Sequence, residues 1–121
     1  MPGISKIQYN RKEILFIDYK GTKSDDEMID ILKQAQEIII RENKEYYQLI
    51  NVQGAYVTPK YLQEAKRIAK ETPKLAKKRA IVGIDSPGRK ILLTAYNLVI
   101  GKDALKPFDD LERAKAWLVK P

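Results

Sequence analysis

The stretch LINVQGAYVTPKYL, residues 49–62, decides the fold class of this chain of 121 residues. Its first residues continue an apolar run that begins at Tyr46, which predicts a buried strand over residues 46–52. Thr58 and Pro59 then mark a helix start, because threonine caps a helix and proline suits its first turn. The stretch therefore predicts a strand, a loop and a helix, the unit from which parallel sheets are built.

The same pattern extends toward the N-terminus. Ser24 and Glu27 have the spacing of a capping box, and apolar residues follow at helical spacing to about Glu42. Two short apolar runs, residues 4–9 and 14–18, come before this helix with a polar loop between them, which predicts an antiparallel hairpin. The second run is apolar on both faces and therefore predicts a strand covered on both sides.

Toward the C-terminus the sequence predicts a strand over residues 79–84, a helix over residues 89–100 and an edge strand over residues 104–108. Asp109 and Glu112 repeat the capping spacing before a last amphipathic helix. We therefore expect an α/β fold with an N-terminal hairpin followed by alternating helix and strand. A mostly parallel sheet of about five strands and four helices follows from this alternation.

Length and composition point to one domain over residues 1–121. The chain contains neither histidine nor cysteine, so the usual general base, thiol nucleophiles and transition-metal ligands are missing. We expect no enzymatic activity, no metal site and no cofactor. The longest apolar stretch, residues 91–100, is shorter than the ~20 residues of a membrane span. Residues 1–8 lack the pattern of a secretory signal, so we expect a cytoplasmic protein.

The net charge of +7 favours acidic partners, because 23 lysines and arginines face 16 aspartates and glutamates. The densest basic stretch consists of Lys66, Arg67, Lys70, Lys74, Lys77, Lys78 and Arg79. No aromatic residues are interleaved there to stack on bases. The stretch is therefore interpreted as a solvated surface, and nucleic acid is disfavoured as a partner.

Two segments carry a family resemblance. Residues 49–62 resemble the third strand, loop and helix start of STAS domains, which include the anti-sigma-factor antagonists. RAIVGI at residues 79–84 and PFDDLERAKAWL at residues 107–118 look like the small stand-alone SpoIIAA-like bacterial proteins of that fold. The resemblance implies a non-catalytic module that docks onto regulatory proteins. In one branch a serine in an Asp-Ser pair is phosphorylated at the second helix start, whereas this chain has Val57-Thr58 there.

The predicted contact surface combines the loop before the second helix with the third helix. The third helix is apolar over most of its circumference, more than one sheet face can cover, and Leu93 and Ile100 are its expected exposed members. The partner-binding residues are predicted to be Gly54, Tyr56, Val57, Thr58, Tyr61, Leu93 and Ile100. A regulatory protein and a second copy of the chain, forming a homodimer, are both expected partners.

Two alternatives remain open. In the first, the chain carries a small apolar ligand or lipid in a cavity lined by the third helix and Tyr56. In the second, strand ends gather polar groups that bind Mg²⁺, a sugar or a phosphate, with Asp18 and Asp85 as catalytic carboxylates. This rim is expected to contain Asp18, Asn51, Gln53, Asp85 and Ser86 near Thr58. Turn and capping roles are the ordinary use of such residues, and we rank the enzyme last.

Overall fold

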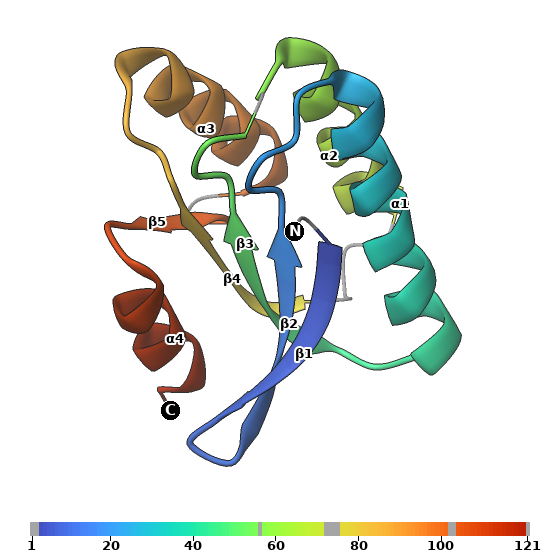
Figure 1. The fold of residues 1–121 in the computed structure, drawn as a ribbon. Coiled ribbons are helices and arrows are strands. Elements are labelled where there is room, and N and C mark those ends of the chain that lie inside the picture. Colours follow the sequence, from blue (N-terminus) through green and yellow to red (C-terminus); the bar gives the residue numbers. More distant parts are fainter. Residues whose placement is uncertain (1–2, 56, 72–75, 102–103, 121) are drawn as a thin grey trace.

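The computed structural model describes residues 3–55, 57–71, 76–101 and 104–120, and this part of the chain forms five strands and four helices (Figure 1). In chain order they are β1 (Gly3–Tyr9), β2 (Lys12–Asp18), α1 (Asp25–Glu42), β3 (Tyr46–Asn51), α2 (Pro59–Glu71), β4 (Ala76–Val82), α3 (Pro87–Ile100), β5 (Lys106–Phe108) and α4 (Leu111–Val119). The predicted order of elements is confirmed. None of the described helices is long and apolar enough to cross a membrane.

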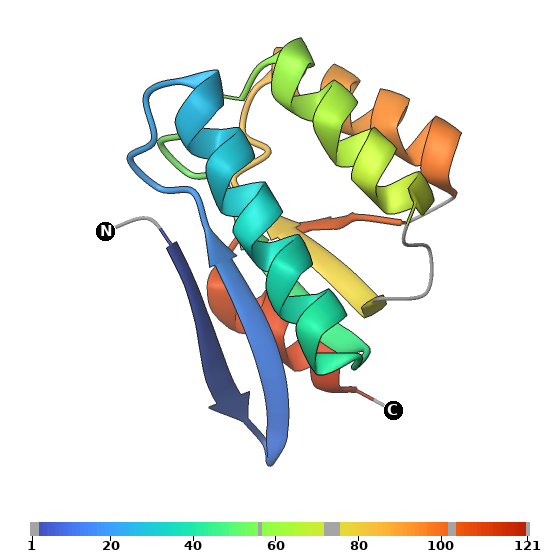
Figure 2. The ribbon, with the colours of Figure 1, turned by 90° about the vertical axis from the view of Figure 1, so that its right-hand side faces the viewer.

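The strands form one sheet in the order β1-β2-β3-β4-β5. β1 is antiparallel to β2, and the remaining neighbours are parallel, which confirms the predicted mostly parallel sheet. Each parallel connection passes through a helix, and right-handed crossovers in sequential order place those helices on the same face. Figure 2 shows α1, α2 and α3 on one side of the sheet and α4 on the other.

Alternating side chains divide the interior into two cores. Leu15 and Ile17 of β2 pack in the core beneath α1, α2 and α3. Ile14 and Leu49 point to the opposite face, where they pack against α4 through Leu118. The prediction that β2 is covered on both sides is therefore confirmed, and its apolar run without alternation reflects this double burial.

The hairpin loop is shorter than the sequence predicts. Asn10 and Arg11 both have positive φ angles, 49° and 66°, as in a two-residue type I′ turn. Tyr9 pairs directly with Lys12 in the ladder, so the polar residues after Arg11 belong to β2. The sequence pattern predicts that these polar residues belong to the loop. In a hairpin at the edge of a sheet, however, every second side chain can face solvent, so polar residues also occur within the strands.

Side-chain oxygens cap the described helices, among them α1, α3 and α4. Ser24 Oγ accepts a hydrogen bond from the Glu27 amide at 3.2 Å, as the capping-box spacing predicts. Ser86 accepts from the amide of Arg89, so α3 begins at Pro87, two residues before the predicted start. The cap of α4 is Asp110 rather than Asp109. Proline at the first position of α3 needs no hydrogen-bond acceptor, which explains why the helix includes it.

The bounds of β4 and β5 also differ from the prediction, and β4 begins at Ala76 instead of residue 79. β4 ends at Val82 instead of residue 84, since Gly83 has a φ of +110° that leaves the extended region. β5 begins at Lys106 instead of residue 104. The backbone of Leu105 bonds the amide side chain of Asn97, with N···O distances of 3.0 and 3.2 Å, and so does not join the sheet ladder.

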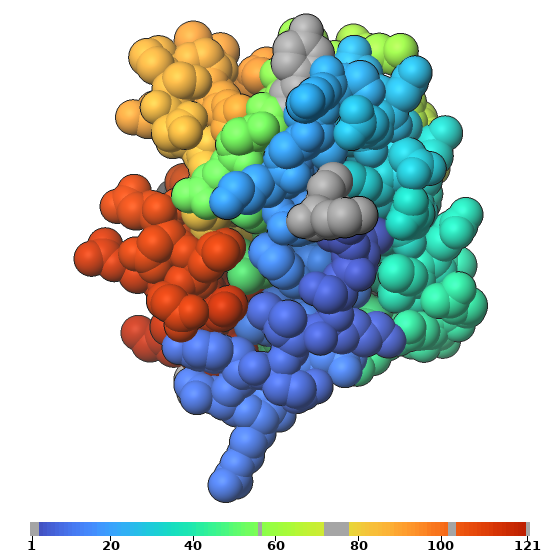
Figure 3. All heavy atoms as spheres, viewed as in Figure 1, coloured from blue at the N-terminus to red at the C-terminus, as the bar shows by residue number. Residues whose placement is uncertain are grey.

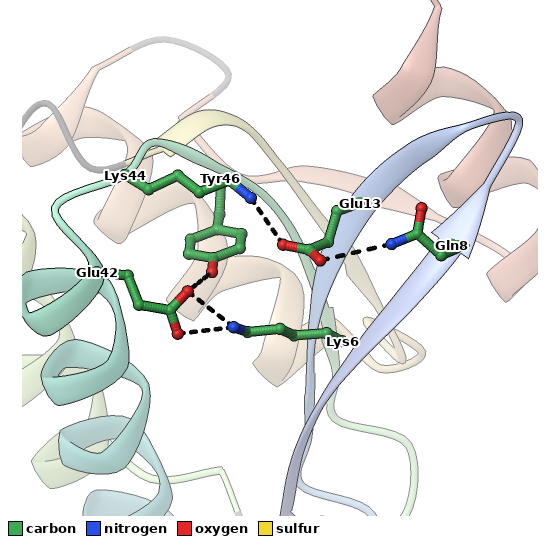
Figure 4. A network of polar contacts seen from close by, with 6 residues as sticks. All are labelled: Lys6, Gln8, Glu13, Glu42, Lys44 and Tyr46. Atoms are coloured by element: carbon green, nitrogen blue, oxygen red, sulfur yellow. Dashed lines mark hydrogen bonds and ion pairs between the residues drawn. The ribbon is translucent and has the colours of Figure 1, made fainter.

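A polar network attaches the hairpin to the end of α1 (Figure 4). Lys6 Nζ lies 2.7 and 2.6 Å from the two carboxylate oxygens of Glu42, which also accepts the hydroxyl of Tyr46. Lys44 Nζ bonds Glu13 at 2.8 Å. The hydrogen bond from Lys6 lowers the pKa of Glu42. These are exposed ion pairs, so their role is to set the position of the hairpin more than to stabilise the fold.

Gly83 is the position where the backbone tolerates no side chain. A Cβ atom built there would lie 2.6 Å from the Gln53 amide nitrogen and 2.9 Å from the Val52 carbonyl carbon. The clash is with backbone of the loop after β3, which cannot rotate away as a side chain would. Two crossover loops therefore touch because residue 83 is glycine.

We predict that Gly83→Ala lowers the free energy of unfolding by about 3 kcal/mol or more, from the clash and the left-handed φ together. Gly88→Ala is the matched control, since Gly88 lies in the first turn of α3 and a Cβ there meets nothing within 4 Å. The control should be neutral or more stable by up to about 1 kcal/mol. Urea unfolding of both variants measures this, and equal stabilities would contradict the packing argument.

Candidate functional site

A cavity lies between the sheet and the helices α1, α2 and α3. Its volume is about 100 Å³, and its walls are almost entirely apolar. Strand residues such as Ile17, Ile50 and Ile81 form the floor, and Leu62 and Leu93 form part of the helical wall. α3 packs mainly beside α2 and makes little backbone contact with the sheet, which leaves this space beneath it.

Among the described residues, three tyrosines line the cavity: Tyr19, Tyr61 and Tyr96. All three are buried, and the rings of Tyr19 and Tyr61 meet edge to face with centroids 5.3 Å apart. Burial raises the pKa of each phenol above its usual value. The hydroxyls therefore remain protonated at neutral pH and provide neutral hydrogen-bond donors in an apolar surrounding.

Two arginines line the same cavity in different states. Arg89, in the first turn of α3, donates to the carbonyls of Val52, Gly83 and Ala55 at 2.8, 2.7 and 2.6 Å. Arg79, in the middle of β4, donates to the Tyr96 hydroxyl at 3.4 Å. Arg89 thus has a structural task, whereas Arg79 brings a cation to the cavity with one long hydrogen bond.

Some of the loop residues that were predicted to bind a partner are instead packed in the core. Val57 packs against the apolar interior and Tyr61 is 8% exposed, and both line the cavity. Gly54 is exposed, with a φ of +65° that glycine adopts readily. Tyr56 lies outside the described residues. The structure therefore brings Val57 and Tyr61 together inside the protein, not on a flat outer surface.

On α3 the expected orientation was wrong. Leu93 and Ile100 are half-buried and pack against the core. The exposed side chains are instead Ile91 (69% exposed), Leu98 (82%) and Val99 (47%). Because the helix is apolar nearly all round, its periodicity did not reveal which side faces the sheet.

Two of the exposed residues of α3 share one helix face with the half-buried Ala95. Ile91, Ala95 and Leu98 follow the offsets of four and seven that place side chains on one helix face. With Lys90 and Thr94 they line a shallow hollow on the surface. In Figure 3 the first turns of α3 form a lobe at the upper left, apart from α4. This outer stripe, Ile91–Ala95–Leu98, is an apolar surface that the described residues leave uncovered.

The predicted polar rim divides into two unconnected groups. Asn51 Nδ2 bonds Asp18 Oδ1 at 3.1 Å, and each residue also holds a nearby backbone amide. Asp85 and Ser86 lie at the start of α3, where Ser86 is the cap and Asp85 is 3.8 Å from Arg89. Among the described residues no three acidic side chains gather as a metal site would need. The rim residues therefore hold turns and caps.

Among known proteins, this chain is similar in structure to a solved protein from Shewanella loihica PV-4. It is described as an uncharacterized protein of the DUF3478 family with a SpoIIAA-like fold. The two superpose with a TM-score of 0.71 over 98% of this chain and 95% of the other. This chain has the SpoIIAA-like fold. Sequence identity is 15%, so the likeness concerns architecture alone. No family model and no curated protein matches the sequence.

Within this SpoIIAA-like fold, part of the predicted basic stretch bonds to other groups of the protein. Arg67 bridges Glu64 and Glu71 on α2, at 2.8 and 3.0 Å. Lys78 donates to the carbonyls of Trp117 and Lys120 and lies over the Trp117 ring. Lys74 lies outside the described residues. The sequence pattern groups Arg79 with the surface charges, but its side chain points inward. Neighbouring residues of a strand face opposite sides of the sheet, so the alternation of Arg79 with the buried Ala80 could have indicated this.

Thr58 stands where the SpoIIAA-like resemblance places a phosphorylated serine. Its hydroxyl oxygen accepts the amide of Tyr61 at 3.2 Å, which confirms the predicted cap of α2. The same hydroxyl donates to the carboxylate of Asp25 in the first turn of α1. A phosphoryl group on Thr58 would meet this carboxylate and repel it. The hydroxyl therefore joins the starts of two helices.

We predict that Thr58→Ala lowers the free energy of unfolding by about 1 to 2 kcal/mol, since the cap and the bond to Asp25 are both lost. Thr58→Ser is the matched control and should retain nearly all stability, because serine offers the same oxygen. Thermal or urea unfolding measures the difference. An alanine variant as stable as the serine variant would refute the capping role.

Proposed function

We propose that this chain is a non-catalytic, STAS-type interaction module that docks a partner protein through the outer stripe of α3. The observation that carries the proposal is the exposure of Ile91 and Leu98 on one helix face. Soluble proteins seldom leave two large aliphatic side chains so open on one face of a helix without a use for them. Helices that dock into grooves present anchors at this same spacing.

The charge of the chain indicates the kind of partner. Lys90 borders the outer stripe, and the whole chain carries a net charge of +7. A groove with an apolar floor and an acidic rim complements both features. Two copies of the chain would repel each other at long range, which favours a different protein over self-association.

The composition supports a binding role over catalysis. With no histidine or cysteine in the sequence, the residues that most often act as base or nucleophile are missing. The polar groups at the strand ends of the described residues are engaged in turns and caps. A cysteine-free chain also suits the reducing cytosol, where we place the protein.

The cavity favours a second candidate function, binding of a small apolar ligand. An apolar cavity of about 150 Å³ takes up benzene, so one of about 100 Å³ admits a molecule somewhat smaller. A lipid with long acyl chains would need α2 and α3 to move apart. The cavity as it stands supports a small ligand only.

We predict that Leu98→Lys leaves stability within about 0.5 kcal/mol of the wild type, because the side chain is already in solvent. Leu93→Lys is the contrasting variant on the same helix and should cost about 2 kcal/mol or more, since it places an ammonium against the core. Thermal unfolding of both variants tests the orientation of α3. Equal losses would contradict the observed exposure.

The docking role itself is tested with a photo-crosslinking amino acid placed at residue 98 in cells of the source organism. We expect one discrete adduct with a second protein, reduced by Ile91→Lys in the same chain. A crosslinker at Ala116, exposed on α4 across the sheet, is the control and should give none. Adducts of twice the chain mass would indicate a homodimer instead, and equal labelling from both positions would overturn the proposal.

A further inference from the structure

Arg79 is placed where a strand would ordinarily carry an apolar side chain. It lies in the middle of β4, opposite Gln48 in the parallel register, and faces the same side of the sheet as Ile81. That side is the floor of the cavity. The residue is half-buried, so its charge is partly removed from water.

The partners of Arg79 leave its charge uncompensated among the described residues. Its hydrogen bond goes to the neutral hydroxyl of Tyr96. The arginine ion pairs among the described residues involve Arg67, Arg89 and Arg113 instead. An arginine has five N–H donors, and the bond to Tyr96 uses one of them, while the residue lines the cavity. Placing a cation in an apolar wall is unfavourable unless an anion or acceptors meet it.

Arg89 shows the contrasting case in the same cavity. Its guanidinium is met by the carbonyls of Val52, Gly83 and Ala55, with the carboxylate of Asp85 at 3.8 Å. Its donors are therefore occupied by the protein itself. Of the two described cationic side chains that line the cavity, Arg79 is the one with fewer donors bonded to the protein.

We propose that the cavity binds a small carboxylic acid, with its hydrocarbon part among the aliphatic side chains and its carboxylate on Arg79 and Tyr96. The guanidinium fork matches a carboxylate, and the hydroxyl of Tyr96 supplies a second donor. Burial keeps that phenol protonated, so it can donate at neutral pH. Because the cavity walls are apolar, the part of the ligand other than its carboxylate is an unbranched or lightly branched hydrocarbon.

The cavity volume limits the length of the acid. By comparison with the six carbon atoms of benzene in a cavity of about 150 Å³, the space of about 100 Å³ holds about four carbon atoms, which is the hydrocarbon tail of pentanoate without its carboxylate. Pentanoate is the appropriate probe, and 1-pentanol is its neutral counterpart of the same length. This proposal concerns the cavity beneath α3. It rests on the second candidate function, binding of a small apolar ligand, and not on docking through the outer stripe.

The first experiment uses the wild-type protein and compares the two probes by ¹H–¹⁵N NMR titration at about pH 7, where the acid is ionised. We expect both to shift amides of the cavity wall, with pentanoate binding about tenfold more tightly than 1-pentanol. Equal affinities would overturn the proposed role of the cation. Absence of binding by either probe would overturn the ligand site as a whole.

The second experiment repeats the titrations with Arg79→Met, which keeps an unbranched side chain and removes the charge. We expect the affinity for pentanoate to fall about tenfold and that for 1-pentanol to stay unchanged. Arg113→Gln is the matched control, because Arg113 lies exposed on α4 across the sheet and its loss changes net charge equally. If Arg113→Gln lowers the affinity for pentanoate as much as Arg79→Met does, then general charge attraction, and not Arg79, holds the acid, and the proposal is overturned.

These outcomes are independent of the docking proposal. Leu98→Lys alters the outer stripe and should leave pentanoate binding unchanged, whereas Arg79→Met should leave the photo-crosslink at residue 98 unchanged. If Arg79→Met fails to fold, the comparison of acid with alcohol on the wild-type protein still decides the matter. Loss of pentanoate binding in the Leu98 variant would contradict the separation of the two sites.

Discussion

The guanidinium of Arg89 connects three backbone carbonyls that belong to two different crossover loops. Val52 and Ala55 follow β3, and Gly83 follows β4. Hydrogen bonds from a charged donor in a half-buried place contribute more than neutral ones, and here three of them meet at the start of α3. The close approach of Gly83 to Gln53 makes this geometry possible, because the two loops must touch for one side chain to reach both.

The other features of the helical layer follow from this attachment. α3 is held at its first turn by Arg89 and near its last turn by the amide of Asn97 on the backbone of Leu105. Between these two points the helix stands off the sheet beside α2, as Figure 2 shows. The space beneath it is the cavity, and the side turned away is the outer stripe of Ile91, Ala95 and Leu98. Both candidate binding surfaces therefore depend on how α3 is held.

Local signals in the sequence predicted the elements, whereas contacts between distant residues decided the site. The caps at Ser24 and Thr58 and the doubly apolar run of β2 are encoded within a few residues, so they predicted the order of strands and helices correctly. The orientation of α3 was not predictable, because a helix that is apolar nearly all round has no preferred face until its neighbours are known. Arg79 was counted with a basic surface stretch, since its charge is visible in the sequence and its inward direction depends on the register of β4.

Hydrogen exchange on Arg89→Met tests the dependence of the helical layer on this guanidinium most directly. The account predicts that amides of α3 and of the loop after β3 lose about 2 kcal/mol or more of protection relative to the wild type, in proportion to the charged hydrogen bonds removed. Amides of α4, which packs on the opposite face of the sheet, should lose distinctly less. If α3 and α4 lose protection equally, or if α3 keeps the protection that it has in the wild type, then Arg89 does not hold the helical layer and the account is contradicted.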